Sequence, residues 1–234
     1  MRIEIWSDIA CPWCYIGKRR LETALAGFDH RDEVELVYRS FQLDPTAPTD
    51  PTETAQEMLS SKYGVSRAEA AGMQARVTEL AAAEGMTWRH DETVHANTLD
   101  AHRLLHLAKQ VGRQVELKEA LLAANFAGAR NLADHAVLRE IAADAGLPAE
   151  RVDAVLGSDE FAADVRADVD QARAYGANGV PFFVVDEKFG VSGAQPTELF
   201  GQLLDRAWRE SHPLVELVGE GGADGACGPD GCAV

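Results

Sequence analysis

The chain has 234 residues and a net charge of −16, with 26% charged and 46% hydrophobic residues. This composition is that of a globular chain long enough to bury a full core, as one elaborated domain or as two small ones. The negative charge disfavours nucleic acid and anionic membrane surfaces as partners, and no apolar run approaches the roughly 18 residues of a membrane span.

The N-terminus has no basic segment followed by an apolar one, so we expect no secretory signal and a cytoplasmic protein. The chain has four cysteines, at positions 11, 14, 227 and 232. In a cytoplasmic protein, this content indicates redox or metal chemistry rather than a framework of structural disulfides.

The first predicted elements enclose two cysteines. Residues 2–6 have strand character and residues 15–25 have the pattern of an amphipathic helix, with Cys11 and Cys14 between them. The two-residue spacing lets one helical turn carry both sulfur atoms. Unpaired N–H groups and the helix dipole favour negative charge on the first sulfur. We therefore assign Cys11 as the nucleophile and Cys14 as the resolving thiol.

Pro12 and Trp13 separate the two cysteines. Pro12 suits the first helical turn because its φ is fixed and it has no N–H to lose. Trp13 offers a flat apolar face beside the sulfur, on which an unfolded chain can lie. The same cysteines could form half of a zinc site, which needs two more ligands, or could simply be packed in a core. The strand and helix that flank them favour dithiol redox chemistry.

The predicted strands fall into two groups with helices between them. A strand at 33–41 follows the first helix and completes a right-handed βαβ unit with parallel strands. Three prolines in 44–51 mark a linker. Strand character returns at 179–186, followed by a hairpin partner at 189–192 and a closing helix to residue 209.

The intervening block is helical almost throughout. A capping box at Ser66-Arg67-Ala68-Glu69 opens a predicted helix at 67–84, and two more helices are predicted at 97–111 and 115–127. Three further helices follow: one is capped by Asp134, one is started by Pro148, and one is capped by Ser158 and ends at 175. The fold class is therefore α/β: a thioredoxin-like fold (βαβ…ββα) with a large all-helical domain inserted after the second strand. The expected domains are 1–50 with 176–212, the inserted 51–175, and a Gly-rich tail at 213–234.

Four stretches of the chain carry a family resemblance. They are SDIACPWCYIG at 7–17, NTLDAHR at 97–103, GVPFF at 179–183 and SGAQ at 192–195. In this order they resemble the DsbA family of thiol–disulfide oxidoreductases, specifically its FrnE-like branch. That branch is related to 2-hydroxychromene-2-carboxylate isomerases and kappa-class glutathione transferases. The isomerases and transferases typically carry a serine at the position of Cys11, so the two thiols here favour disulfide exchange.

The resemblance implies further site residues. It implies a cis bond between Val180 and Pro181, with the Val180 backbone free to bind an extended peptide or glutathione; the alternative is a trans proline that begins a strand. It also implies that the region of Asn97, Thr98 and His102 lines a substrate pocket over the active site. A helix cap at Asn97 and a hydrogen-bonded core histidine at His102 explain these residues equally well.

The tail carries the other two cysteines, Cys227 and Cys232, around a Gly-Pro-Asp-Gly turn signal. The turn would bring their sulfur atoms together. We predict a second redox pair that exchanges electrons with Cys11 and Cys14, as some FrnE-like members suggest. A local disulfide, or a metal site with Asp224 or Asp230 as further ligands, remains an alternative.

These observations lead to one main functional prediction, a thiol–disulfide oxidoreductase with isomerase capacity, acting on protein or small-molecule disulfides. We predict no bound cofactor or metal, with glutathione as a conceivable co-substrate, and the exposed helical block is compatible with a homodimer. One alternative is a glutathione-dependent isomerase or transferase that acts on a small aromatic substrate. A third is a peptide-binding or metal-buffering protein without exchange activity.

Overall fold

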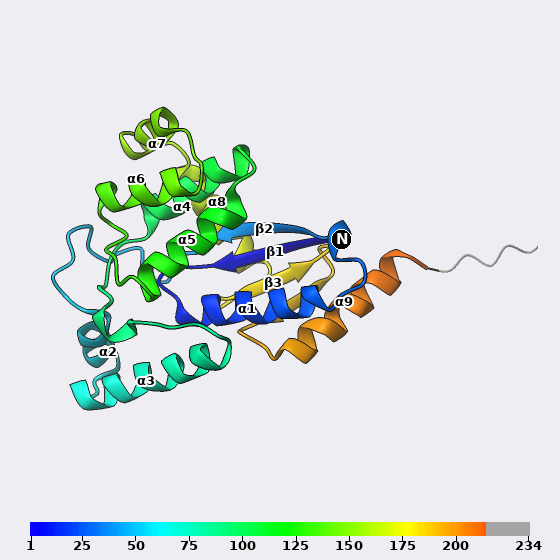
Figure 1. The fold of residues 1–234 in the computed structure, drawn as a ribbon, viewed down its shortest axis with the longest axis horizontal. Coiled ribbons are helices and arrows are strands. Elements are labelled where there is room, and N and C mark those ends of the chain that lie inside the picture. Colours follow the sequence, from blue (N-terminus) through cyan, green and yellow to red (C-terminus); the bar gives the residue numbers. More distant parts are fainter. Residues whose placement is uncertain (214–234) are drawn as a thin grey trace, which may run out of the picture.

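The computed structural model describes residues 1–213 and contains a four-stranded sheet with helices on both faces (Figure 1). The sheet order is β2-β1-β3-β4. Strand β1 pairs in parallel with β2 and antiparallel with β3, and β3 pairs antiparallel with β4. This topology confirms the predicted thioredoxin-like α/β fold. The strands are β1 Arg2–Ser7, β2 Glu35–Ser40, β3 Phe182–Val185 and β4 Phe189–Ser192.

Helices α2 to α8 lie between β2 and β3, as predicted for the helical insertion. The expected domain boundaries around this insertion stay a prediction. No helix within residues 1–213 is both long and apolar enough to cross a membrane. The helices are α1 Pro12–Ala26, α2 Ala55–Tyr63, α3 Arg67–Ala83, α4 Leu99–Gln110, α5 Gln114–Phe126, α6 His135–Asp144, α7 Ala149–Leu156, α8 Ala162–Ala174 and α9 Thr197–Ser211, with 3-10 turns at Arg31–Glu33 and His90–Glu92.

The two faces of the sheet are covered by different helices because side chains alternate along β1. Ile3 and Ile5 are buried in one cluster with Leu21 of α1 and Phe200 of α9. Trp6 packs on the opposite face, in a cluster with residues of α8 and β3. Its indole N–H also donates to the carbonyl oxygen of Asp168 at 2.7 Å. The sheet is thus buried on both faces near the end of β1.

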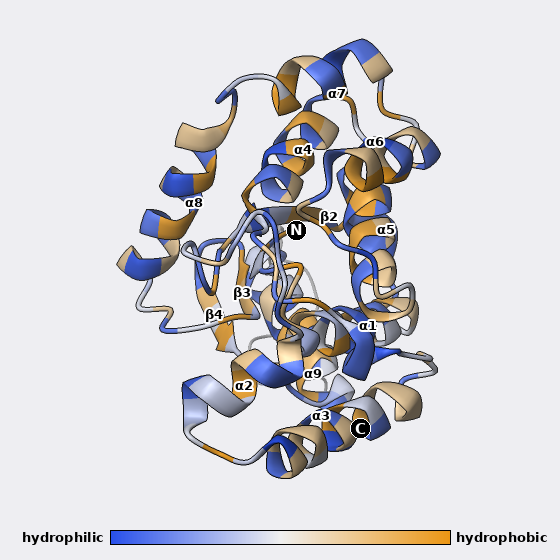
Figure 2. Cartoon of the chain, turned by 90° about the vertical axis from the view of Figure 1, so that its left-hand side faces the viewer, coloured by the Kyte–Doolittle hydropathy of each residue, from blue (hydrophilic) through white to orange (hydrophobic). Residues whose placement is uncertain are grey.

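A third cluster joins the helical insertion to the thioredoxin-like part. Ile9, Tyr15 and Ile16, from the start of α1 and the loop before it, pack with the leucines of α4 and α5. Figure 2 shows hydrophobic residues mixed with hydrophilic ones along α4 and α5. The contact places the insertion directly against the first turn of α1, where the two cysteines lie.

Local capping signals placed most helix starts correctly. Ser66 and Glu69 form the predicted capping box of α3, and the Asp134 side chain accepts from the Ala136 N–H at the start of α6. The prediction that Ser158 caps α8 was wrong. Helix α8 begins only at Ala162, and the Ser158 hydroxyl donates to the Ala154 carbonyl at the end of α7. A serine in this sequence context satisfies a C-terminal carbonyl as readily as an N-terminal N–H.

Candidate active site

The two motif cysteines occupy the first turn of α1. Strand β1 ends at Ser7 and α1 begins at Pro12, with Cys11 in extended conformation as its N-cap. The Cys11 carbonyl accepts from the Cys14 N–H at 3.1 Å, so one helical turn carries both side chains. Both are almost fully buried. This geometry agrees with the expectation from the two-residue spacing.

The thiol of Cys14 is held in its neutral form. Burial raises the pKa of Cys14 well above its usual range, and the hydrogen bond and charge of Cys11 raise it further. Lys118 acts in the opposite direction through its positive charge. Cys14 can therefore become a nucleophile only after it loses a proton.

The loop before β3 lies against Cys11. The Val180–Pro181 bond is cis, as the family resemblance implied, and the Cys11 Sγ lies 3.6 Å from the Val180 carbonyl oxygen. Trp13, which lies between the two cysteines in the sequence, is 40% exposed. A Cβ atom on Gly17 would lie 3.1 Å from the Pro181 Cγ, so α1 and this loop are in close contact. The structure thus brings the predicted support residues together around Cys11.

Asp8 and His102 form a buried pair behind the motif. Their side chains are joined through His102 Nε2 and Asp8 Oδ1 at 3.3 Å, and Asp8 also accepts from the Leu43 N–H at 2.8 Å. Burial alone would raise the pKa of Asp8, but its hydrogen bonds and the charge of His102 lower it on balance. Burial lowers the pKa of His102. A carboxylate beside a neutral imidazole is the resulting state near pH 7.

The three predicted substrate-binding residues occupy different environments. His102 is fully buried, and its imidazole pairs with Asp8 behind the motif. Thr98 is one of the residues that line a cavity next to Cys11. The Asn97 side-chain oxygen Oδ1 accepts from the Leu99 N–H, and its side-chain Nδ2 donates to the backbone carbonyl groups of Pro45 and Ala47. Asn97 therefore binds the first N–H of α4, next to the N-cap residue Thr98, and holds the proline-rich segment against it.

Lys118 is a residue of this site that sequence reasoning missed. Its side chain is 1% exposed, and its Nζ donates to the carbonyl oxygen of Ser7 at 3.4 Å. Burial lowers the pKa of Lys118 to about 8, although the nearby cysteines and Asp8 raise it. The available signal was its spacing in α5, because Lys118 lies four residues after Gln114 and four before Leu122, both buried.

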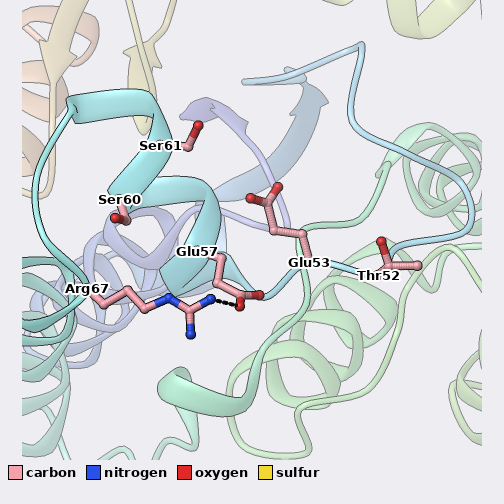
Figure 3. Close-up of a pocket in the computed structure, with 6 residues that line it drawn as sticks. All are labelled: Thr52, Glu53, Glu57, Ser60, Ser61 and Arg67. Atoms are coloured by element: carbon pink, nitrogen blue, oxygen red, sulfur yellow. Dashed lines mark hydrogen bonds and ion pairs between the residues drawn. The ribbon is translucent and has the colours of Figure 1, made fainter.

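A cavity of about 270 Å³ lies beside Cys11, and we call it the side cavity. It is bounded by the motif, by the segments around Leu43 and Thr98, and by α2 and α3. A separate hollow lies at the start of α2, around Glu57 and Arg67, and contains none of the predicted site residues (Figure 3). Of these two hollows, the side cavity is the one that adjoins Cys11.

Two further predictions concerned a metal site and the cysteines of the tail. Within residues 1–213, no group of three or more His, Cys, Asp and Glu side chains is placed to hold a metal ion. Cys227 and Cys232 lie outside the described residues. The last turn of α9 lies at the far end of α1 from Cys11, where Trp208 contacts Phe28.

Comparison with known proteins gives a family match over most of the chain. Residues 2–205 match the model of the DSBA-like thioredoxin domain. The crystal structure of a probable DsbA oxidoreductase from Streptomyces coelicolor is 51% identical, with a TM-score of 0.86, and covers 100% of this chain and 99% of that one.

Two more distant structures share the fold. A 2-hydroxychromene-2-carboxylate isomerase is 12% identical with a TM-score of 0.64, covering 90% of this chain and 98% of its own. The cytosolic disulfide reductase DsbM from Pseudomonas aeruginosa, solved with GSH, is 17% identical with a TM-score of 0.63. That match covers 89% of this chain and all of DsbM.

Proposed function

The chain belongs to the family of DSBA-like thioredoxin domains, and from that membership we propose that it exchanges disulfides through Cys11 and Cys14. It would act as a thiol–disulfide oxidoreductase with isomerase capacity on protein or small-molecule disulfides. The observation that carries this proposal is the pairing of Cys11, which lines the side cavity, with the buried neutral thiol of Cys14 one turn later.

The reaction begins at Cys11. Its sulfur, as thiolate, attacks one sulfur of the substrate disulfide, the substrate S–S bond breaks, and the leaving thiolate takes a proton from water. The product is a mixed disulfide between Cys11 and the substrate. Extended substrate backbone can lie beside Val180, whose carbonyl is near the Cys11 sulfur.

Cys14 completes the exchange. It loses its proton, attacks the Cys11 sulfur, and releases the second substrate thiolate, which is then protonated. The protein dithiol is oxidised to a disulfide and the substrate disulfide is reduced, so two electrons are transferred. From the oxidised protein the same steps run in reverse. No cofactor is required, and glutathione can serve as the small thiol that recycles the pair.

The decisive experiment combines a trap with a redox titration. Cys14→Ser should accumulate the mixed disulfide through Cys11, and Cys11→Ser should form none, as seen by mass spectrometry without reductant. A glutathione redox series on the native protein then gives the potential. A value of about −270 mV indicates a reductant like thioredoxin, and about −120 mV an oxidant like DsbA. Failure of Cys14→Ser to trap any substrate would overturn the proposal.

A second candidate is a glutathione-dependent isomerase or transferase for a small aromatic substrate. The apolar side cavity next to Cys11 favours it. In that case Cys11 would accumulate only as a mixed disulfide with glutathione, and activity would survive in Cys14→Ser.

The same proposal includes a cytoplasmic location, membership of the FrnE-like branch and a homodimer. It also includes disulfide exchange between the active-site pair and the pair Cys227 and Cys232. Turnover that is unchanged in the double variant Cys227→Ser, Cys232→Ser would exclude this second exchange.

A further inference from the structure

A histidine and an aspartate form a hydrogen-bonded pair in the wall of the side cavity. His95 Nε2 and Asp44 Oδ2 lie 3.1 Å apart, and both residues line the cavity together with Cys11. The other carboxylate oxygen, Asp44 Oδ1, accepts from the Thr46 N–H at 2.9 Å and from the Thr46 hydroxyl at 2.6 Å. The aspartate is thus fixed through one oxygen and orients the imidazole through the other.

The charge of the aspartate suits proton transfer by the histidine. Hydrogen bonds from Thr46 lower the pKa of Asp44, and the charge of His95 lowers it further, so Asp44 is ionised near pH 7. An ionised aspartate bonded to one imidazole nitrogen fixes the ring and offsets its positive charge when the ring is protonated. Histidine side chains gain or lose that proton between about pH 5 and 8. The pair is therefore suited to move a proton at the second ring nitrogen.

The second ring nitrogen, His95 Nδ1, is available to another molecule. It has no hydrogen-bond partner among residues 1–213. Gln74 Oε1 and His90 Nδ1 also lack a partner, but those two atoms are buried, whereas solvent reaches His95 Nδ1. The His95 side chain as a whole is 14% exposed. Because His95 lines the cavity, we expect a group bound there to reach this nitrogen.

The other Asp, His and Lys side chains of the cavity wall are less suited to donate a proton. Asp8 is a carboxylate near pH 7, because the effect of burial on its pKa is outweighed by its hydrogen bonds. Burial lowers the pKa of His90 to about 4, so that ring is neutral. Lys62 is exposed at the end of α2, and no hydrogen bond or ion pair with residues 1–213 fixes its side chain. His95 combines an oriented ring with an accessible nitrogen.

We propose that His95 is a catalytic residue of the disulfide exchange, which donates a proton to the substrate sulfur that leaves when Cys11 attacks, with Asp44 as its positioning residue. The Cys11 sulfur bonds to one substrate sulfur and the substrate S–S bond breaks. The proton passes from the His95 imidazolium to the departing thiolate, which leaves as a thiol, and the neutral ring regains a proton from water. The inference rests on the proposed disulfide exchange and adds the source of its proton.

The test compares two uncharged disulfides that differ in how much the leaving sulfur needs a proton. Dithiodipyridine releases a weakly basic thiolate, and hydroxyethyl disulfide releases a strongly basic one, which leaves more slowly without help. Both react with the Cys14→Ser protein, which stops at the mixed disulfide, and mass spectrometry follows the adduct at pH 7. In His95→Gln, which keeps a donor for Asp44, the rate on hydroxyethyl disulfide relative to that on dithiodipyridine should fall by at least about tenfold.

The matched control is a second histidine that pairs with an aspartate. His135 Nε2 lies 2.7 Å from Asp100 Oδ2, and His135 does not line the side cavity. His135→Gln should therefore keep the native ratio of the two rates. Asp44→Asn, which retains an acceptor without the charge, should lower the ratio by a smaller factor than His95→Gln, and an unchanged ratio would exclude Asp44 from the role.

The ratio separates the role of His95 from other effects of the substitution. It compares two substrates of one protein, so changes in folding or in Cys11 reactivity cancel. An unchanged ratio in His95→Gln would overturn the proposal, and so would an equal fall in both rates, because the histidine would then act on Cys11 and not on the leaving sulfur. If Cys11→Ser formed the adducts as fast as the protein with Cys11, the proposed disulfide exchange itself would fail.

Discussion

The ammonium nitrogen of Lys118 lies 3.4 Å from the carbonyl oxygen of Ser7, the last residue of β1. A helix of the insertion thereby places a buried positive charge at the strand end from which the cysteine loop starts. The charge lowers the pKa of Cys14, against the effects of burial and of Cys11. The insertion therefore contributes to the electrostatics of the thiols as well as to the walls of the cavity.

Replacing Lys118 should make Cys14 harder to deprotonate. In Lys118→Met, the pKa of Cys14 rises, and its displacement of the substrate from Cys11 slows at pH 7 by about tenfold for each pKa unit. The measurement is the release of the second thiol from a preformed mixed disulfide, followed by stopped flow between pH 6 and 10. Lys188→Met, in the exposed turn after β3, is the matched control. Identical pH profiles for the two variants would contradict the role of Lys118.

His90 should make the protein sensitive to acid. Burial lowers its pKa from 6.5 to about 4, so between these values the unfolded chain binds more protons than the folded one. Stability from this residue is therefore complete above pH 6.5 and falls as the pH drops towards 4, by up to about 3 kcal/mol. Urea unfolding at pH 7 and pH 4.5 should show a smaller loss for His90→Gln than for the native protein. Parallel losses would show that other groups cause the acid sensitivity.

Glu119 should anchor α5 to α1. Its carboxylate accepts from the buried Lys18 at 2.5 Å and from the Tyr15 hydroxyl at 2.7 Å. Glu119→Ala leaves Lys18 with Glu22 as its remaining carboxylate partner, and we expect the free energy of unfolding to fall by about 2 kcal/mol.

The control lies on the same helix. Glu116→Ala breaks an exposed pair with Arg113 and should cost less than about 1 kcal/mol. Urea denaturation at pH 7 measures both variants. Equal losses would mean that the contact of α5 with α1 does not depend on Glu119.

A side chain at Gly17 should destabilise the protein, because α1 contacts the cis-proline loop there. A Cβ atom there would lie 3.1 Å from Pro181 and 3.3 Å from Phe183. Gly72, in α3, has no atom within 4 Å of the same position. Gly72→Ala should therefore stabilise the protein by about 1 kcal/mol through helix propensity. Gly17→Ala should be less stable than Gly72→Ala by about 1–3 kcal/mol because of overpacking. Thermal unfolding measures the melting temperature of both variants. Equal shifts in melting temperature would show that the cis-proline loop moves away from the added methyl group.

The sequence determined those features that depend on neighbours along the chain. Alternation placed the strands, and capping residues such as Ser66 and Asp134 placed helix starts within a few residues. The spacing of Cys11 and Cys14 put both in one turn for the same reason. Ser158 was misplaced because its side chain can bond to a helix end on either side, and only the packing of α7 and α8 decides which.

The tertiary structure decided which distant residues surround those cysteines. Lys118 lies more than 100 positions after Ser7, and Gln74 and His90 come from a helix and a turn with no chemical motif. The spacing of Lys118 within α5 is a weak signal of burial, and a glutamine in an Ala-rich helix has none. The folded chain removes these groups from water and sets them against the thiols or the cavity, and desolvation then gives them their altered pKa values or unpaired atoms. Burial of this kind is a property of contacts between elements, so the sequence pattern of one element does not decide it.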